Sequence, residues 1–356
     1  MNSEEIIKQL NELSFISNEL EVSESDRLRM IKTVSDYANK FLSGLDDIKV
    51  FSERKPGSLF IKNKKRSLEE LLNVYQTEVA ETGINAASGK HLGYIPSGGI
   101  FTAALADFIA AVTNPYASVY YASPGAAEIE NEVINWLKKV FSFPDSSVGN
   151  LTSGGSVSAL IAFTAARDKH KIKNELIPKS VVYLTEQVHH SVQKVLRIIG
   201  LEDIIIRYVE LDENHRLKTN SLTKVIEKDI SSGLNPFLVV GTAGTTDTGA
   251  VDPLNEISEI AKQHKMWFHV DAAYGGFFIL TSKKDLFKGI ENADSLIIDP
   301  HKGMFIPYGV GAVLIKDKNS VLHSNYYTAN YMQDAATEEM IKSPANLSPE
   351  LTKHFR

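Results

Sequence analysis

Six short apolar runs, rich in β-branched residues, recur over the second half of the chain. Segments with a helical spacing of apolar positions lie between several of them, notably 188–200, 217–231 and 253–265. Short strands that alternate with helices are typical of an α/β domain with a mainly parallel central sheet flanked by helices. The predicted strands are 181–185, 204–211, 237–244, 267–273, 295–299 and 311–316.

Ahead of these runs the pattern is mostly helical. Apolar positions with a helical spacing predict helices over residues 1–50, 99–113 and 126–142. Residues 51–66 contain Pro56-Gly57 and a basic cluster, and we interpret them as a linker with a solvated surface. We therefore expect an N-terminal helical segment and linker over residues 1–66, followed by a larger domain.

The composition narrows the class of protein. The chain has 356 residues and a net charge of −6, so nothing in it favours nucleic acid or a membrane as a partner. It has no cysteine, which excludes disulfides, thiolate nucleophiles and cysteine-ligated metals, and we assign no metal site. No apolar stretch approaches the roughly 18 residues of a membrane-spanning helix. We expect a soluble, cytoplasmic protein.

Polar residues follow four of the predicted strands at the point where each strand ends. Because the carboxyl ends of parallel strands meet at one edge of a sheet, and ligands bind there, we expect these residues to share one crevice. They are His189-His190, Thr245-Thr246, Asp271 and His301-Lys302.

The segment NLTSGGSVSALIAFTAARD, residues 150–168, runs from a Ser/Gly-rich turn into an amphipathic helix. Free amide hydrogens and the macrodipole favour an anion at such a helix start. Gly155 allows close backbone approach, and the Ser156 hydroxyl adds a donor. An ordinary capped helix gives the same pattern, so this segment alone does not decide. The G-x-G-x-x-G fingerprint is absent, which argues against a dinucleotide-binding oxidoreductase.

Asp271 and Lys302 are the two charged residues that suggest a chemistry. Asp271 interrupts the apolar run in WFHVDAAYGG, where a carboxylate is costly unless a cation, such as a protonated ring nitrogen, pairs with it. Ala273 leaves room for a flat ring. Lys302 is crowded by apolar strands and His301, which makes it a candidate amine nucleophile.

An anion site, a carboxylate for a ring nitrogen and a lysine for an aldehyde are the supports that pyridoxal phosphate requires. His189 can supply a flat ring that stacks on the pyridine. The sequence pattern alone does not decide between His189 and His190 for this position.

Several motifs together resemble the group II pyridoxal-phosphate-dependent decarboxylases, the family of the aromatic-amino-acid, tyrosine, histidine and glutamate decarboxylases. The resemblance runs from about residue 25 to the last residue. It implies an aspartate-aminotransferase-like fold (fold type I), pyridoxal 5′-phosphate as cofactor, and a homodimer with active sites at its interface. The motifs are HLGYIPSGG (91–99), SPGAAEIENEVINWL (123–137), TSGGS (152–156), EQVHHSV (186–192), GTTDTGAVDPL (244–254), HVDAAYGG (269–276), DPHKG (299–303) and SPELTKHFR (348–356).

The resemblance also implies a role for each matching residue. Lys302, with His301 beside it, resembles the lysine that forms an imine with the cofactor. Asp271 resembles the partner of the pyridine nitrogen. Ala273 resembles the small residue against the ring, and His189 falls on the stacking histidine. The other matching positions are Gly155 and Ser156 at the phosphate turn, Thr246 near the far face of the cofactor, Tyr331 in a mobile loop over the partner subunit's site, and Tyr94 and Pro96 in the substrate pocket.

The activity that the resemblance implies is decarboxylation of an L-amino acid to an amine and carbon dioxide, with Lys302, His189, Tyr331 and Asp271 as catalytic residues. Two alternatives stay open. One is another reaction of the same cofactor, such as aldehyde synthesis or carbon–carbon lysis, although Tyr331 argues against the aldehyde-forming relatives. The other is a non-catalytic or split-gene partner subunit.

The end of the chain motivates that second alternative, because the family continues past ELTKHFR into a small C-terminal domain. We expect a large cofactor-binding domain over residues 67–320, and the mobile loop and the start of a truncated C-terminal domain over 321–356. Val157 and Gly303 stand where many relatives carry Glu and Trp, which leaves the substrate open.

Overall fold

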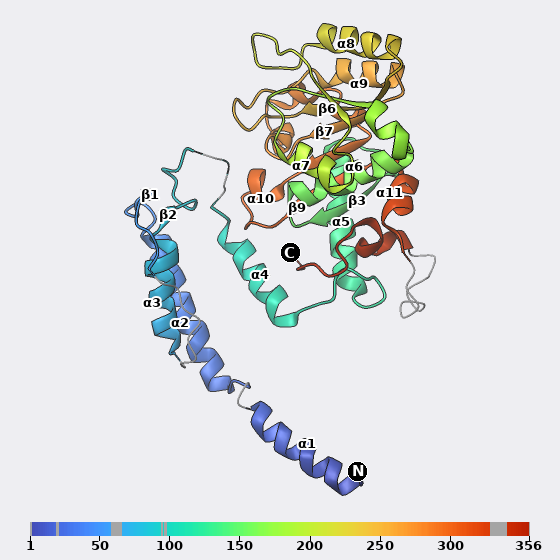
Figure 1. Cartoon of the computed structure of the whole chain (residues 1–356). Coiled ribbons are helices and arrows are strands. Elements are labelled where there is room, and N and C mark those ends of the chain that lie inside the picture. The colour runs from blue at the N-terminus through green and yellow to red at the C-terminus, as the bar shows by residue number, and fades with distance from the viewer. Residues whose placement is uncertain are drawn as a thin grey trace. The chain divides into compact units, whose positions relative to one another are not determined.

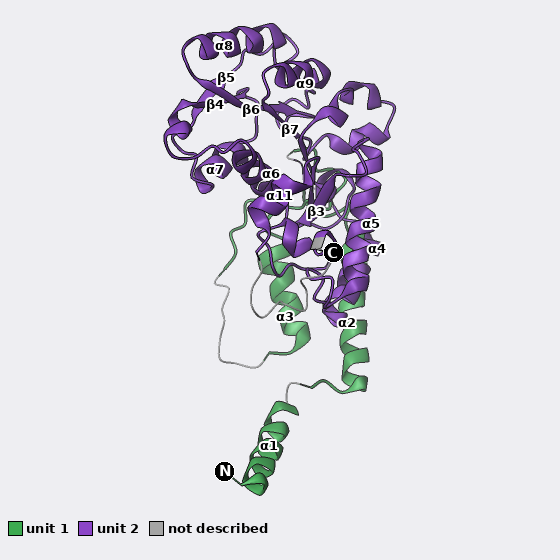
Figure 2. Ribbon diagram, turned by 90° about the vertical axis from the view of Figure 1, so that its right-hand side faces the viewer, with its two compact units in different colours: residues 1–93 green, residues 94–356 purple. Residues whose placement is uncertain are grey.

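The computed structural model describes residues 2–18, 21–57, 66–93, 95, 98–327 and 340–355. The chain forms two compact units, Met1–Gly93 and Tyr94–Arg356, shown in Figures 1 and 2. Within the described residues, no helix combines the length and the apolar character needed to cross a membrane.

Helices dominate the first unit, and capping side chains explain where they begin. The side chain of Asn2 caps the first helix, Ser23 the second and Ser67 the third, each by accepting hydrogen bonds from backbone N–H groups of the first turn. At Asn2 and Ser67 a glutamate completes a capping box. The predicted N-terminal helical segment is therefore confirmed. The helices are α1 (Ser3–Ser17), α2 (Glu24–Ser43) and α3 (Leu68–Tyr75), which continues into a π-helical turn, η2 (Gln76–Ala80).

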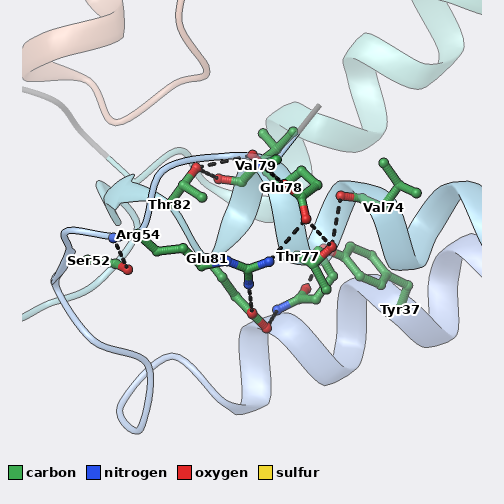
Figure 3. A network of polar contacts seen from close by, with 11 residues as sticks. Tyr37, Ser52, Arg54, Val74, Thr77, Glu78, Val79, Glu81 and Thr82 are labelled. Carbon is green, nitrogen blue, oxygen red and sulfur yellow. Dashed lines mark hydrogen bonds and ion pairs between the residues drawn. The ribbon is translucent and has the colours of Figure 1, made fainter. Parts of the chain in front are cut away.

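Arg54, in the segment that we interpret as a linker, is part of a polar network with the chain that follows α3 (Figure 3). Its guanidinium lies 3.0 Å from the Glu78 carboxylate and 3.3 Å from that of Glu81. The Tyr37 hydroxyl of α2 donates to the Gln76 side chain at 2.7 Å. Because the Arg54 side chain is 45% exposed, each ion pair contributes only about 0.5 kcal/mol.

The first unit extends past the boundary that we draw after residue 66. Strand β1 (Phe51–Ser52) pairs antiparallel with β2 (Gly83–Ile84), and α3 packs on α2. These contacts join segments on both sides of residue 66. The boundary set by contacts consequently falls between Gly93 and Tyr94.

The described residues of the second unit form a seven-stranded sheet in the order β3-β9-β8-β7-β6-β4-β5. Strands β5, β4, β6, β7 and β8 are parallel neighbours, whereas β9 runs antiparallel to β8 and to β3. The prediction of a mainly parallel sheet is confirmed, and six strands lie within or beside their predicted ranges. The strands are β3 (Val148–Thr152), β4 (Ser180–Leu184), β5 (Ile205–Tyr208), β6 (Asn235–Thr242), β7 (Trp267–Asp271), β8 (Ser295–Ile298) and β9 (Gly311–Ile315).

Strand β3 has no counterpart among the predicted strands, because Gly149 and Asn150 break its apolar pattern. Both residues serve packing. A Cβ at Gly149 would lie 2.7 Å from the Val313 carbonyl oxygen, so only glycine fits there. The buried Asn150 amide donates to the Pro344 carbonyl at 2.7 Å.

Helices cover both faces of the sheet, as strands that are buried on both faces require. Val181 and Tyr183 of β4 pack into one apolar cluster with α5, α8 and α9, while Val182 and Leu184 pack into the other with α6, α7 and α11. The helices of this unit are α4 (Phe101–Thr113), α5 (Pro124–Val140), α6 (Gly155–Lys169), α7 (Ser191–Ile198), α8 (Thr219–Ser231), α9 (Leu254–Gln263), α10 (Pro300–Gly303) and α11 (Lys318–Asn325).

Candidate active site

A cavity of about 320 Å³ lies at the carboxyl ends of β6, β7 and β8, beside the start of α6. The predicted shared crevice is therefore present, at the edge of the sheet where α/β proteins bind ligands. Eight of the residues that we select from the sequence line it: Gly155, Ser156, His189, Thr246, Asp271, Ala273, His301 and Lys302. The three others, Tyr94, Pro96 and Tyr331, lie outside the described residues.

The start of α6 forms one wall of the cavity. Gly154 precedes the helix with φ 142°, a conformation that favours glycine, and no described side chain caps the helix. The first amide groups of a helix have no partner within it, and the macrodipole places partial positive charge there. Gly155 and Ser156 line the cavity at this point. This wall can hold an anionic group.

The buried carboxylate of Asp271 lines another part of the cavity. Asp271 is the last residue of β7 and is 6% exposed. The backbone N–H of Ala273 donates to Asp271 Oδ1 at 3.1 Å, which fixes the orientation of the carboxylate. Ala273 also lines the cavity, and its small side chain leaves the space in front of the carboxylate open.

Lys302 lies on α10, a single helical turn that begins with Pro300 directly after β8. Its Nζ atom lies 3.1 Å from Asp299 Oδ2, and its side chain is 25% exposed. His301 is held by a hydrogen bond from its Nδ1 to the Val310 carbonyl at 2.6 Å. The turn thus presents the lysine amine to the cavity from a fixed backbone.

The structure distinguishes the two neighbouring histidines by which of them lines the cavity. His189 lines the cavity and His190 is not among its lining residues, although their rings lie 4.1 Å apart. The backbone N–H of Ser191 donates to His189 Nδ1 at 3.3 Å, and the Ser191 hydroxyl lies 2.8 Å from the same atom, so both groups orient the ring. Burial lowers the pKa of His189, and His190 lowers it further. His189 is therefore neutral at physiological pH.

The loop after β6 brings Thr246 to the cavity. Gly244 and Gly275 allow this, because a Cβ at Gly275 would lie 2.3 Å from the Ala243 carbonyl oxygen and one at Gly244 would lie 2.7 Å from Gly275 Cα. The two loops consequently touch backbone to backbone at the ends of β6 and β7.

Among the lining residues to which the sequence prediction assigns no role, Asp299 and Gln187 are polar and lie beside predicted ones. Asp299 is 2% exposed and contacts Lys302, and Gln187 lines the cavity near His189. A sequence signal for Asp299 exists, because a carboxylate directly after a buried strand and three residues before a lysine falls on the same side of a helical turn. Gln187 has no such signal.

Residues 55–352 match the pyridoxal-dependent decarboxylase conserved domain. The chain is similar to the aromatic-L-amino-acid decarboxylase of Bacillus atrophaeus, with 36% identity over 81% of this chain and 60% of that protein. It is also similar to tyrosine decarboxylase 2 of Narcissus pseudonarcissus, with 30% identity over 87% of this chain and 65% of that protein. The chain thus spans less than two thirds of the length of both relatives.

Solved structures show the same fold. The tryptophan decarboxylase of Catharanthus roseus, in complex with L-tryptophan, superposes with a TM-score of 0.83 and 24% identity over 94% of this chain and 73% of that one. The Oryza sativa structure described as TDC with PLP and tryptamine superposes with a TM-score of 0.86 and 21% identity, over the same shares of both chains. The predicted fold class, aspartate-aminotransferase-like, is confirmed.

Proposed function

Because the chain belongs to the pyridoxal-dependent decarboxylase family, we propose that it converts an aromatic L-amino acid to the corresponding amine and carbon dioxide. The observation that carries this proposal is the meeting of Lys302, Asp271 and the start of α6 in one cavity. Similarity to the aromatic-L-amino-acid decarboxylase of Bacillus atrophaeus supports the aromatic substrate class.

The cofactor of this family is pyridoxal 5′-phosphate, and the residues present fit it. The start of α6 suits its phosphate, because unpaired amides and the macrodipole favour an anion. The buried Asp271 suits its pyridine nitrogen, since a carboxylate in that setting favours a cationic partner. A cavity of about 320 Å³ suits a single small flat ring. When bound, the cofactor supplies an aldehyde for amine attack and a ring that accepts electrons.

Two residues carry the main chemical work in this proposal. The Lys302 amine would hold the cofactor through its aldehyde. Asp271 would keep a proton at the ring nitrogen, which would strengthen the ring as an electron acceptor. Both groups come from rigid positions at strand ends, so little reorganisation is needed.

The other lining residues position these groups. His189, kept neutral by burial, offers a flat ring to the cavity. Ala273 leaves room for the cofactor ring, Ser156 supplies a hydroxyl at the anion wall, and Thr246 closes the far side. Delivery of a proton to Cα by Tyr331, and contacts of Tyr94 and Pro96 with the substrate, stay predictions.

The activity is tested by incubating the protein, saturated with pyridoxal phosphate, with tyrosine, tryptophan, phenylalanine and dihydroxyphenylalanine. We expect equal amounts of carbon dioxide and amine from at least one of them. Lys302→Ala should abolish both products, whereas Lys262→Ala, at an exposed position on α9, should not.

Two results would overturn the decarboxylase proposal. Aldehyde and ammonia in place of amine would indicate a different reaction of the cofactor. Cofactor binding without any product would indicate a non-catalytic or split-gene partner subunit. The comparisons do not favour either alternative.

We also propose a homodimer, supported by apolar side chains that each unit exposes. Helix α4 buries only Ala110 among its residues, while Leu105, Phe108, Ile109 and Val112 are between 48% and 68% exposed. Exposed apolar groups of this density typically mark an interface. A second copy of the chain is the simplest partner that covers them. The cytoplasmic location stays a prediction.

A further inference from the structure

Asp299 lies between the start of α6 and Lys302, where the cofactor phosphate is proposed to bind. It is the residue before α10, a position at which aspartate usually caps the helix. Here its side chain makes no cap, and Oδ2 contacts Lys302 Nζ at 3.1 Å instead. A Cβ at Gly155 would lie 3.0 Å from Oδ2, and one at Gly311 would lie 2.8 Å from Oδ1. Backbone therefore encloses the carboxylate on two sides.

The two carboxylate oxygens have different surroundings. Oδ2 has the lysine ammonium, and His301 Nε2 lies 3.8 Å from it. Oδ1 is buried and has no hydrogen-bond partner among the described residues. An ionised carboxylate that leaves one oxygen buried without a donor pays the desolvation of that oxygen. If this oxygen carried a proton, it would become a hydrogen-bond donor beside the start of α6, where an anion can bind.

A phosphate that binds at the start of α6 would further destabilise the ionised form of the Asp299 carboxylate. The phosphate would bind at the amides of Gly155 and Ser156, within a few ångströms of the Asp299 carboxylate. Two like charges at such a distance cannot both stay ionised without a large penalty. A protonated carboxyl group instead forms a strong charge-assisted hydrogen bond to the oxyanion.

The charged groups around Asp299 have opposing effects on the ionisation of its carboxyl group. Lys302 and His301, on α10, favour the ionised carboxylate, whereas Asp271, at the end of β7, opposes it. The walls contributed by α6 and β9 bring glycine backbone to it, which carries no titratable group. Burial is the largest influence and raises the pKa of Asp299. The ion pair with Lys302 is thus the main support for the ionised carboxylate, with a smaller contribution from His301.

From this geometry we infer that Asp299 exchanges one partner for another when the cofactor binds. In the cofactor-free protein its carboxylate holds Lys302 as an ion pair. When the phosphate binds at the start of α6, Asp299 takes up one proton from solvent, donates a hydrogen bond to the phosphate and releases the Lys302 amine. The inference rests on the proposed function, because it assigns the cofactor phosphate to this wall.

The test measures binding without catalysis. The probe is 4′-deoxypyridoxine 5′-phosphate, a cofactor analogue in which a methyl group replaces the aldehyde, so it cannot react with Lys302. Its dissociation constant is measured by titration calorimetry between pH 6 and pH 9 for the full chain and for Asp299→Asn. An asparagine amide donates without taking up a proton. We therefore expect the ratio of the two constants, wild type over variant, to rise with pH by up to about tenfold per unit.

Asp294→Asn is the matched control. Asp294 is also buried with a raised pKa, but it precedes the opposite end of β8, where it accepts from the Phe268 N–H at 2.8 Å. Its variant should keep the wild-type pH dependence. Lys302→Met provides a second variant: without the ammonium, Asp299 holds its proton to higher pH, so the onset of the pH dependence should move upward.

The outcomes separate the inference from the function. Equal pH dependence in wild type and Asp299→Asn overturns the inference and leaves the decarboxylase proposal intact. Weaker binding by Asp299→Asn at every pH also overturns it, since the carboxylate would then be needed in its ionised form. If Asp299→Asn does not fold, an onset that does not move in Lys302→Met has the same consequence. No binding of the probe to the wild-type protein contradicts the cofactor site itself.

Discussion

Lys302 shows how much a single side chain depends on its immediate surroundings. It lies on one helical turn, with its amine 3.1 Å from Asp299 and only a quarter of its side chain exposed. Exposed lysines such as Lys169 also form ion pairs, so it is the position in the lining of the cavity that distinguishes Lys302. The combination of an ion pair with a neighbouring cavity is typical of a functional amine.

We predict that Lys302→Ala removes the visible absorbance band of the lysine-bound cofactor and lowers turnover by several orders of magnitude, because no other described amine lines the cavity. The measurement is an absorbance spectrum of the protein with added pyridoxal phosphate, alongside a carbon dioxide assay. Lys262→Ala should keep both signals. A visible band that survives in Lys302→Ala would refute the assignment of the lysine.

Strand β6 ends against a buried carboxylate. Asp252 is 3% exposed and accepts hydrogen bonds from the backbone N–H groups of Thr242 and Leu217, both at 2.7 Å. It thereby ties the loop after β6 to the end of the strand, from which Thr242 lines the cavity. Burial raises the pKa of Asp252 to about 6, despite these hydrogen bonds.

This pKa makes the stability of the element depend on pH. The pKa of Asp252 in the folded state lies above the ordinary value of 3.8. The contribution of this residue to the free energy of unfolding is therefore complete below pH 3.8 and is lost as pH rises through about 6. We predict that the free energy of unfolding of the wild type, relative to Asp252→Asn, falls by up to about 3 kcal/mol between pH 4 and pH 7. Urea unfolding at several pH values measures this difference.

Asp247→Asn, at an exposed position in the same loop, is the control and should show no such trend. A constant difference between wild type and Asp252→Asn over this pH range would contradict the prediction.

At the scale of the whole molecule, the exposed apolar side chains are the feature that the isolated chain leaves unexplained. Helix α1 has no buried residue, and Leu10, Leu13 and Phe15 are 58% to 78% exposed. Helix α4 is similar, with Phe108 and Ile109 more than half exposed. Such surfaces are costly in water and are covered in most assemblies.

We predict that the wild-type protein is a dimer at micromolar concentration and that Phe108→Glu with Ile109→Glu raises its dissociation constant at least about a hundredfold. Each change replaces an apolar side chain worth about 1.5–3 kcal/mol of burial with a charge. Analytical ultracentrifugation measures the constant. Lys262→Glu, on α9, should leave it unchanged. A wild-type monomer, or a dimer indifferent to both glutamates, would contradict the proposed homodimer.

The sequence by itself determined the mainly parallel sheet, because most of its strands read as apolar runs, and β4, β7, β8 and β9 are buried over their whole length. It also indicated the region of the site, since polar residues at the carboxyl ends of parallel strands must lie at one edge. Strand β3 could not be predicted from the sequence. Its residues Gly149 and Asn150 are explained only by contacts with Val313 and Pro344, which are distant in sequence.

Only the tertiary structure decided which residues face the cavity. His189 and His190 are equivalent in the sequence pattern, and packing at the start of α7 places one of them in the lining. Asp299 shows the same limit in part. Its pairing with Lys302 follows from a spacing of three residues, whereas its contact with the start of α6 exists only in the folded chain. The pattern of apolar residues within one segment shows which of its side chains are buried. Contacts between segments depend on distances that exist only once the chain has folded.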